Sequence, residues 1–314
     1  MASTLHEIRK FLPRLMRRLR LVMELPAQID LLREALGRIE ERQILSGQQL
    51  PLDNARDAEF RVFSQWGEDG LIATILREVP ITRSTFIEFG VETFVEANTR
   101  FLLTRRNWSG TVIDGSERNI EAIKRSSAYW KHDLHARHAF ITAENIDETL
   151  RSAHPDPDLG LLSIDIDGND YWVWKAITSL SPRIVICEYN SLFGPDAAVT
   201  IPYDPGFSRA ATGPQRMCYG ASIAALHHLA REKGYSLVAG NTSGNNAFFV
   251  RNDCLGKLSP RTPNQAYAQA QFREGRGANG EVTHLTFEAR QRSISESSVF
   301  DVRTLTSGPL RVFL

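Results

Sequence analysis

The sequence has 314 residues, of which 42% are hydrophobic and 24% charged, and lysine plus arginine equal aspartate plus glutamate at 37 each. This composition is typical of a soluble globular protein with one main core. No apolar run approaches the roughly 18 residues of a membrane-spanning helix, and the balanced charge argues against a nucleic-acid partner.

The three cysteines, Cys187, Cys218 and Cys254, have no CxxC spacing and are odd in number, which argues against a zinc site or a disulfide framework. The N-terminus lacks the uninterrupted apolar stretch and small-residue cleavage site of a signal peptide. We therefore expect a retained N-terminus and a cytoplasmic protein.

Residues 5–45 are predicted to be helical, and Pro13 and Pro26 are expected to kink or restart the helix. A stripe of apolar residues spaced by three and four favours a short coiled coil and hence a homo-oligomer. The stripe consists of Val22, Leu25, Ile29, Leu32, Leu36 and Ile39.

Basic residues precede this stripe and alternate with apolar ones. Such a pattern suits a helix lying on an anionic membrane surface at the inner face of the membrane. Packing against its own protein or a sister chain is the favoured alternative. The basic residues are Arg9, Lys10, Arg14, Arg17, Arg18 and Arg20.

A polar segment at 46–57 is predicted to be a linker between an N-terminal helical region, 1–48, and a main domain, 49–255. Apolar strands alternate with helical patterns through the main domain, which indicates parallel crossovers in a doubly wound sheet of about seven strands. Residues 256–314 are polar and are expected to form a loosely structured C-terminal cap. The strands are expected at 84–90, 110–116, 138–145, 161–167 and 183–190, followed by a pair at 235–240 and 246–252.

Ligands of an open parallel sheet bind beyond the carboxyl ends of its strands. The first strand ends in Gly90 with Glu88 and Glu92 beside it, whereas a phosphate-binding loop needs several glycines and no carboxylate facing the anion. Asp114 at the end of the second strand suits a ribose or a helix cap equally well. Glu144, after the third strand, suits an adenine edge or a cap. Together they describe a nucleoside site without phosphates, which fits S-adenosylmethionine.

Five segments in this order resemble the FkbM-type S-adenosylmethionine-dependent methyltransferases over roughly residues 60–252. The resemblance implies a class I methyltransferase (Rossmann-like) fold and methylation of hydroxyls on sugars, polysaccharides and related natural products. By position, Glu88, Gly90 and Asn98 would lie along the methionine part of the cofactor, Asp114 would bind its ribose, and Gln65 would close the pocket. The first loop departs from the usual pattern, because Val91 and Glu92 follow a single glycine. The segments are "SQWGEDG", "FIEFGVETFVEANTRFLL", "WSGTVIDGS", "LLSIDIDGNDYWVW" and "NNAFFVR".

Acidic residues also follow the fourth and fifth strands. Asp165 and Asp167 come from "SIDID", and Glu188 and Asn190 come from "CEYN" at the same edge of the sheet. These four oxygen donors suit Mg²⁺, which would activate an acceptor hydroxyl. Without a metal, Asp167 or Asp165 would act as the general base. A third interpretation leaves one aspartate facing the ligand, with Gly168 forming the turn and Asn169 or Asp170 capping the next helix.

The connection at 191–222 is too long for a plain crossover and is expected to form the acceptor pocket, with Tyr203, Asp204 and Tyr219 contacting a carbohydrate. The sequence thus predicts an O-methyltransferase acting on a sugar hydroxyl of a glycan, glycolipid or glycosylated natural product. Two alternatives stay open: an NAD- or nucleotide-sugar-dependent enzyme on the same fold, and a catalytically inert scaffold of a glycan-synthesis complex.

Overall fold

The computed structural model of the chain describes residues 2–46, 52, 55–209, 216–272, 275–277 and 279–314, and for residues 2–15 and 17 it describes the backbone alone. The expected linker at 46–57 and the predicted basic side chains up to Arg17 therefore lie largely outside the described residues.

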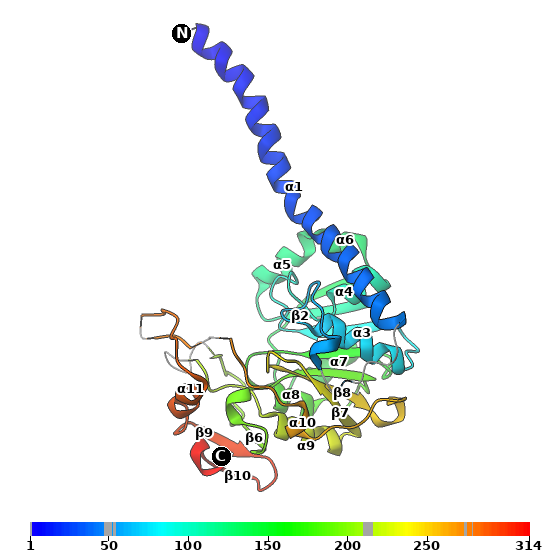
Figure 1. Cartoon of the computed structure of the whole chain (residues 1–314), viewed down its shortest axis with the longest axis vertical. Helices are drawn as coiled ribbons and strands as arrows, with labels where there is room; N and C mark the ends of the chain where they lie inside the picture. The colour runs from blue at the N-terminus through cyan, green and yellow to red at the C-terminus, as the bar shows by residue number, and fades with distance from the viewer. Residues whose placement is uncertain (1, 47–51, 53–54, 210–215, 273–274, 278) are drawn as a thin grey trace.

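A seven-stranded mixed sheet forms the centre of the molecule (Figure 1). Six of the seven strands run in one direction, and β8 runs against them: it pairs antiparallel with β5 on one side and with β7 on the other. The predicted doubly wound sheet with a closing antiparallel pair is confirmed. In spatial order the strands are β3 (Leu134–His138), β2 (Ser109–Asp114), β1 (Thr85–Phe89), β4 (Leu161–Ile164), β5 (Ile184–Glu188), β8 (Asn246–Arg251) and β7 (Tyr235–Gly240).

Helices cover both faces of the sheet, so the central strands are buried on both sides and read as nearly continuous apolar runs. Successive residues point to opposite faces: Ile87 and Phe89 pack on one face, and Phe86 packs on the other. The first face is covered by α7 (Ile146–Ala153), α8 (Asp170–Ala176) and α9 (Ile223–Glu232). The second face is covered by α3 (Glu68–Glu78), α4 (Arg100–Arg106), α5 (Glu117–Arg125) and α6 (Ser127–Lys131).

The third strand differs from its prediction at 138–145, because β3 spans Leu134–His138 and Phe140 and Ile141 fall in the loop beyond it. As the edge strand, β3 buries only Leu134, so it lacks the apolar run by which a central strand is found. Phe140 and Ile141, the apolar residues on which the strand prediction rested, instead line a cavity at the edge of the sheet.

Helix α1 (Ala2–Ser46) is continuous through both prolines, so neither restarts it. Its C-terminal part packs on the main domain: Asp30 pairs with Arg100 at 2.7 Å, and Glu41 pairs with Arg106 at 2.7 Å. Figure 1 shows its N-terminal part projecting beyond the rest of the molecule. Among the described residues no helix is long and apolar enough to cross a bilayer. The three cysteines are all free.

The C-terminal region is more ordered than its polar composition predicts, because it shares a small core with the long connection after β5. Val199 of that connection packs with Ile294, Val299 and Leu310. The second sheet has the order β10 (Thr306–Pro309), β9 (Ser298–Asp301) and β6 (Val199–Thr200). The remaining elements are α2 (Ala55–Ala58), η1 (Ser191–Phe193), η3 (Asn252–Cys254), α10 (Pro263–Ala266), α11 (Phe287–Ser293) and η4 (Leu310–Val312).

Candidate active site

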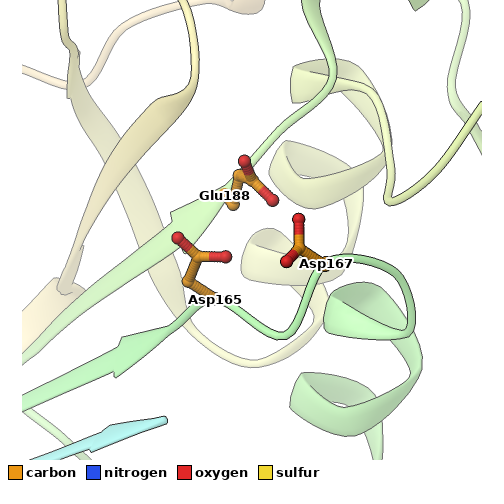
Figure 2. Close-up of side chains that lie close together, drawn as sticks. All are labelled: Asp165, Asp167 and Glu188. Carbon is orange, nitrogen blue, oxygen red and sulfur yellow. The ribbon is translucent and has the colours of Figure 1, made fainter. Parts of the chain in front are cut away.

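Three carboxylates meet where strands β4 and β5 end. Asp165 follows β4 directly, Asp167 lies on the turn after it, and Glu188 is the last residue of β5. One carboxylate oxygen of each lies within 4.8 Å of the other two, and Figure 2 shows the three groups gathered at one place. Ile164 and Cys187 are partners in the parallel register, so the two strands end side by side. The structure therefore brings Asp165, Asp167 and Glu188 together.

Burial and mutual repulsion make this cluster hard to ionise fully. Burial raises the pKa of Asp165 well above its usual range, and the charges of Asp167 and Asp170 raise it further. The pKa of Glu188 is raised by burial and then by Asp165 and Asp167. Because like charges at this distance oppose each other, the group retains a proton at a pH where exposed carboxyls have lost theirs. Glu188 also has a buried oxygen, Oε2, without a hydrogen-bond partner among the described residues.

Arg209 supplies positive charge at the open side of the cluster. Its Nη1 donates to Asp167 Oδ1 at 2.6 Å, and its Nε donates to the carbonyl of Arg216 at 3.0 Å. The guanidinium lies 3.7 Å from the ring centroid of Tyr219. Tyr219 is buried, so it acts on the cluster through Arg209 and does not face the cavity directly. Sequence reasoning missed Arg209, which lies inside the Gly- and Pro-rich connection.

The turn that carries the aspartates is shaped by Asp170. Its carboxylate accepts from the backbone N–H groups of Ile166 and Gly168 at 2.9 Å each, and burial raises its pKa to about 6. Asp167, and not Gly168, takes the left-handed conformation, with φ of 56°. Gly168 is required for another reason: a Cβ there would lie 2.2 Å from the ring of Phe207. Asp170 therefore holds the turn but does not cap the helix. Asn169, at the N-cap of α8, makes no side-chain capping bond either, so the predicted capping role is not met by either residue.

Asp114 connects the loops after the first two strands. One carboxylate oxygen accepts from the N–H of Glu92 at 2.8 Å, and the other accepts from Ser116 N–H at 2.8 Å and Asn119 Nδ2 at 3.0 Å. Ser116 is the residue that caps α5, so Asp114 does not fill the helix-cap role. Its side chain instead fixes the loop that begins at Gly90 and lines a cavity beside it.

Glu88 is largely engaged in holding the start of α4. Its carboxylate accepts from the backbone N–H groups of Asn98 at 2.8 Å and Thr99 at 3.1 Å, and burial raises its pKa. The side chain of Asn98 donates to Ser163 Oγ at 3.1 Å on β4. These two predicted cofactor residues thus connect β1, β4 and α4 at the edge of the sheet.

Two adjoining cavities open at this edge. The larger has a volume of about 660 Å³ and the smaller about 190 Å³, and both are lined by Gly90, Glu92, Asp165 and Asp167. The other predicted residues divide between them. Gln65, Glu88, Asn98 and Glu188 line the larger, and Asp114 lines the smaller.

Five predicted site residues do not line either cavity. The Asn190 amide donates to the carbonyls of Met217 at 2.9 Å and Tyr219 at 3.1 Å, and its Oδ1 accepts from Leu192 N–H. Because β5 ends at Glu188, strand alternation does not carry Asn190 to the cluster. The prediction of Asn190 as a metal ligand is therefore not met by its placement. The other four are Glu144, Tyr203, Asp204 and Tyr219.

Tyr203 and Glu144 contact each other instead. The hydroxyl of Tyr203 donates to Glu144 and accepts from the N–H of Ala143 at 3.1 Å, at the surface of the molecule. Asp204 is engaged locally, because its Oδ1 accepts from Gly206 N–H and its carbonyl accepts from Asn169. The long connection thus meets the loop after β3, and its contribution to the cavities comes from other residues.

Aromatic and amide residues absent from the prediction complete the larger cavity. Trp66 and Phe272 stack with ring centroids 5.6 Å apart and planes at 22°. Asn245 and Asn246 come from the β7–β8 hairpin. Phe140 and Phe207 line the smaller cavity. Trp66 and the two asparagines lie inside the quoted segments "SQWGEDG" and "NNAFFVR", whereas nothing in the sequence singles out Phe272.

Glu68 joins those two quoted segments. Its Oε2 accepts from the N–H groups of Trp66 and Gly67 at 3.0 Å each, and its Oε1 accepts from Asn241 Nδ2 at 2.6 Å and Asn246 Nδ2 at 3.0 Å. The residue is fully buried, so these four bonds replace the solvation that its carboxylate loses. The shape of the larger cavity therefore depends on Glu68, although Glu68 does not line it.

The strand order, with five parallel strands followed by an antiparallel β8 inserted between β5 and β7, defines the class I methyltransferase fold, a Rossmann-like doubly wound sheet. No family model and no curated protein matches the chain.

Solved structures with similar folds include an O-methyltransferase from Bacillus cereus in complex with SAH, at 13% identity and a TM-score of 0.35 over 53% of this chain and 72% of that one. A SAM-dependent methyltransferase from Aquifex aeolicus is 7% identical, with a TM-score of 0.36 over 64% and 99%. A precorrin-6y C5,15-methyltransferase from Geobacter metallireducens is 10% identical, with a TM-score of 0.35 over 65% and 98%. At these low scores the assignment of the fold rests on the sheet itself.

Proposed function

We propose that this chain is an S-adenosylmethionine-dependent O-methyltransferase of the FkbM type, acting on a sugar hydroxyl of a glycan, glycolipid or glycosylated natural product. The observation that carries the proposal is the pair of adjoining cavities. A small one beside Asp114 shares its wall with a larger one that is lined by the cluster of Asp165, Asp167 and Glu188. A nucleoside and an acceptor held in these two places would meet at Gly90 and Asp165.

The smaller cavity has the groups that an adenosine requires. Asp114 stands at the end of the second strand, where an acid can accept hydrogen bonds from ribose hydroxyls. Phe140 and Ile141 offer apolar surface for the base. The loop at Gly90 and Glu92 holds no set of glycines for a pyrophosphate, and its acidic side chain favours the positive sulfonium over a phosphate.

The larger cavity has groups for accepting a proton from an alcohol. In the proposed reaction the acceptor oxygen bonds to the methyl carbon while the carbon–sulfur bond breaks, and its electron pair stays on sulfur. The hydroxyl proton passes to a carboxylate oxygen of Asp165. Because its pKa is raised, the ionised form of this carboxylate is a stronger base than an exposed aspartate. Trp66 lines the same cavity, and aromatic side chains are common in the walls of ligand sites.

The carboxylate cluster also fits a divalent cation such as Mg²⁺. Three oxygen donors converge within 4.8 Å, and one of them, Glu188, has an unpartnered buried oxygen. Asp165, Asp167 and Glu188 would hold the ion, and a bound divalent cation would lower the pKa of the acceptor hydroxyl and orient its oxygen. Asp167 would then exchange its contact with Arg209 for the ion.

Calorimetry with S-adenosylhomocysteine tests the proposal directly. We expect one molecule to bind per chain, and Asp114→Asn to weaken the binding at least tenfold. NAD and a UDP-sugar, titrated in parallel, should give no comparable heat. If S-adenosylhomocysteine and S-adenosylmethionine both fail to bind, or if NAD or the UDP-sugar binds instead, the proposed function is wrong.

A further inference from the structure

Among the described residues three arginines line the larger cavity, and two of these have no acidic partner within that part of the chain. Arg209 pairs with Asp167. Among the described residues, no carboxylate lies within ion-pair distance of Arg216 or Arg276. Arg276 also has a buried guanidinium nitrogen, Nη1, for which the described part of the chain offers no hydrogen-bond partner. Buried donors in folded proteins almost always find a partner, so this one indicates a place for a ligand.

Arg216 and Arg276 come from two segments that touch. Their chain neighbours are Met217 and Gly275, and a Cβ on Gly275 would lie 3.1 Å from the sulfur of Met217. The carbonyl of Arg216 accepts from Arg209, which places this segment beside the carboxylate cluster. The larger cavity therefore has acidic groups on the sheet edge and basic groups on the segments that cover it.

We propose that Arg216 and Arg276 bind an anionic group, a phosphate or a carboxylate, carried by the methyl acceptor. The inference rests on the proposed function and narrows its substrate to acidic sugars. Guanidinium groups bind both anions through paired hydrogen bonds, and burial strengthens those bonds. An acceptor held at its anion by the arginines would extend its hydroxyl toward Asp165.

The test is calorimetry on the full chain saturated with S-adenosylhomocysteine, with glucose 1-phosphate, glucuronate and methyl glucoside as probes. We expect at least one anionic probe to bind tenfold or more tightly than the neutral glucoside. The stronger of the two anions identifies the phosphate or the carboxylate as the natural group. Arg216→Gln and Arg276→Gln should each weaken that binding about tenfold. Arg311→Gln, at an exposed position paired with Glu296, is the matched control.

Three outcomes would overturn the proposal. The anionic probes do not bind more tightly than the glucoside, or the two substitutions leave anion binding unchanged. In the third outcome the two substitutions weaken the binding of S-adenosylhomocysteine and leave the binding of the probes unchanged. That result would assign the arginines to the carboxylate of the cofactor. Failure of S-adenosylhomocysteine to bind the unmodified chain is a separate result, and it counts against the proposed function itself.

An independent observation concerns helix α1. The six residues of its apolar stripe, which runs from Val22 to Ile39, are between 46% and 65% exposed. The opposite side of the helix packs on its own domain through Asp30, Gly37 and Glu41. With Val22 at heptad position a, the stripe occupies a and d, and the packed residues occupy b and f, which lie on the far side of the helix.

We infer that the stripe pairs with the same stripe of a second chain to form a two-stranded coiled coil. In two of the three heptads, β-branched Val22 and Ile29 at a, with Leu25 and Leu32 at d, favour two strands. The third heptad, with Leu36 at a and Ile39 at d, has the reverse order and does not add to this preference. The domain does not obstruct this pairing, because it contacts the other side of α1.

Light scattering on the full chain should give twice the chain mass of 35.3 kDa. Leu32→Glu should give monomers, whereas Leu31→Glu, the same change at an equally exposed neighbour off the stripe, should leave dimers. A monomeric unmodified chain overturns the inference, and binding of that monomer to phosphatidylglycerol vesicles would assign the stripe to a membrane instead. Loss of dimers in both variants would also count against it.

Discussion

Gly90 and Asp165 follow neighbouring strands, and their backbones touch: a Cβ at position 90 would lie 1.7 Å from the carbonyl oxygen of Asp165. Gly90 also has a φ of 66°, which side chains rarely adopt. A glycine is therefore required at position 90 for two reasons: the backbone has a left-handed conformation, and the carbonyl of Asp165 leaves no room for a side chain. It brings the loop after β1 onto the loop that carries the aspartates.

Gly90→Ala should destabilise the protein and abolish S-adenosylhomocysteine binding, because one loop must move away from the other. The matched control is Gly234→Ala, with φ of 80° but no atom within 4 Å of the new Cβ. Gly234→Ala should lose about 1–2 kcal/mol of stability, the cost of placing a side chain on a left-handed backbone. Thermal unfolding and calorimetry measure both effects, and equal losses in the two variants would show that the contact with Asp165 is unimportant.

Asp165→Asn should lower kcat by about 10²- to 10⁴-fold, because the acceptor hydroxyl loses its base. Binding of S-adenosylhomocysteine should change only a few-fold, since asparagine keeps the size of the side chain and the acceptor hydroxyl takes no part in that binding. Asp133→Asn, at an exposed position before β3, should change neither value. A variant of Asp165 with normal kcat would remove this residue from the mechanism.

Arg209→Met should increase the affinity for Mg²⁺, because it removes the cation that now pairs with Asp167. Asp167→Asn should weaken Mg²⁺ binding at least tenfold. Titration calorimetry in two buffers of different ionisation enthalpy should also detect proton release, since the carboxyl groups must ionise to bind the ion. No Mg²⁺ binding by either the unmodified chain or Arg209→Met would eliminate the metal.

The contribution of Asp69 to the free energy of unfolding should fall as the pH rises from about 4 to 6. Burial raises its folded-state pKa from 3.8 to about 6, so the folded state binds more protons than the unfolded state in this window. The loss amounts to about 3 kcal/mol when the shift is complete. Asp69→Asn keeps an oxygen acceptor for the N–H groups of Val62, Phe63 and Ser64 and should flatten the dependence. Urea unfolding at pH 4, 5, 6 and 7 measures it.

Asp147 provides the comparison for Asp69. Burial raises its pKa, but hydrogen bonds from Thr178 and Ser179 outweigh that effect and hold the value at about 2. Asp147 therefore stabilises the protein above its unfolded pKa of 3.8, and this contribution is lost as the pH falls toward 2. Asp147→Asn should change the dependence only below pH 4. If Asp69→Asn leaves the slope between pH 4 and 6 unchanged, the assignment to Asp69 is wrong.

The sheet could be predicted because buried parallel strands have long apolar runs, and the carboxylate cluster because both strands end in acids. The prediction failed where those signals stop. β3 is an edge strand with one buried side chain, so its position shifted toward Phe140 and Ile141. Asn190 lies beyond the last residue of β5, where strand alternation no longer applies.

The residues that cover the larger cavity, such as Phe272 and Arg209, could not be predicted. They are held in place by contacts with residues that are distant in sequence. Phe272 stacks on Trp66 across 206 positions (272 minus 66). Arg209 is placed by the ring of Tyr219 and the charge of Asp167, and none of these contacts leaves a local pattern. In the same way, tyrosine is a residue type that often contacts sugars, but the hydroxyl of Tyr203 donates to Glu144 instead.

The four hydrogen bonds to Glu68 also determine when the larger cavity can form. They join residues 66 and 67 to residues 241 and 246, so they require the β7–β8 hairpin to have added to the edge of the sheet at β5. During synthesis, a chain that has emerged only as far as β5 has the aspartates and the Gly90 loop but lacks one side of the cavity. Ligand binding at this site therefore reports that the β7–β8 hairpin has been added and that the sheet is complete.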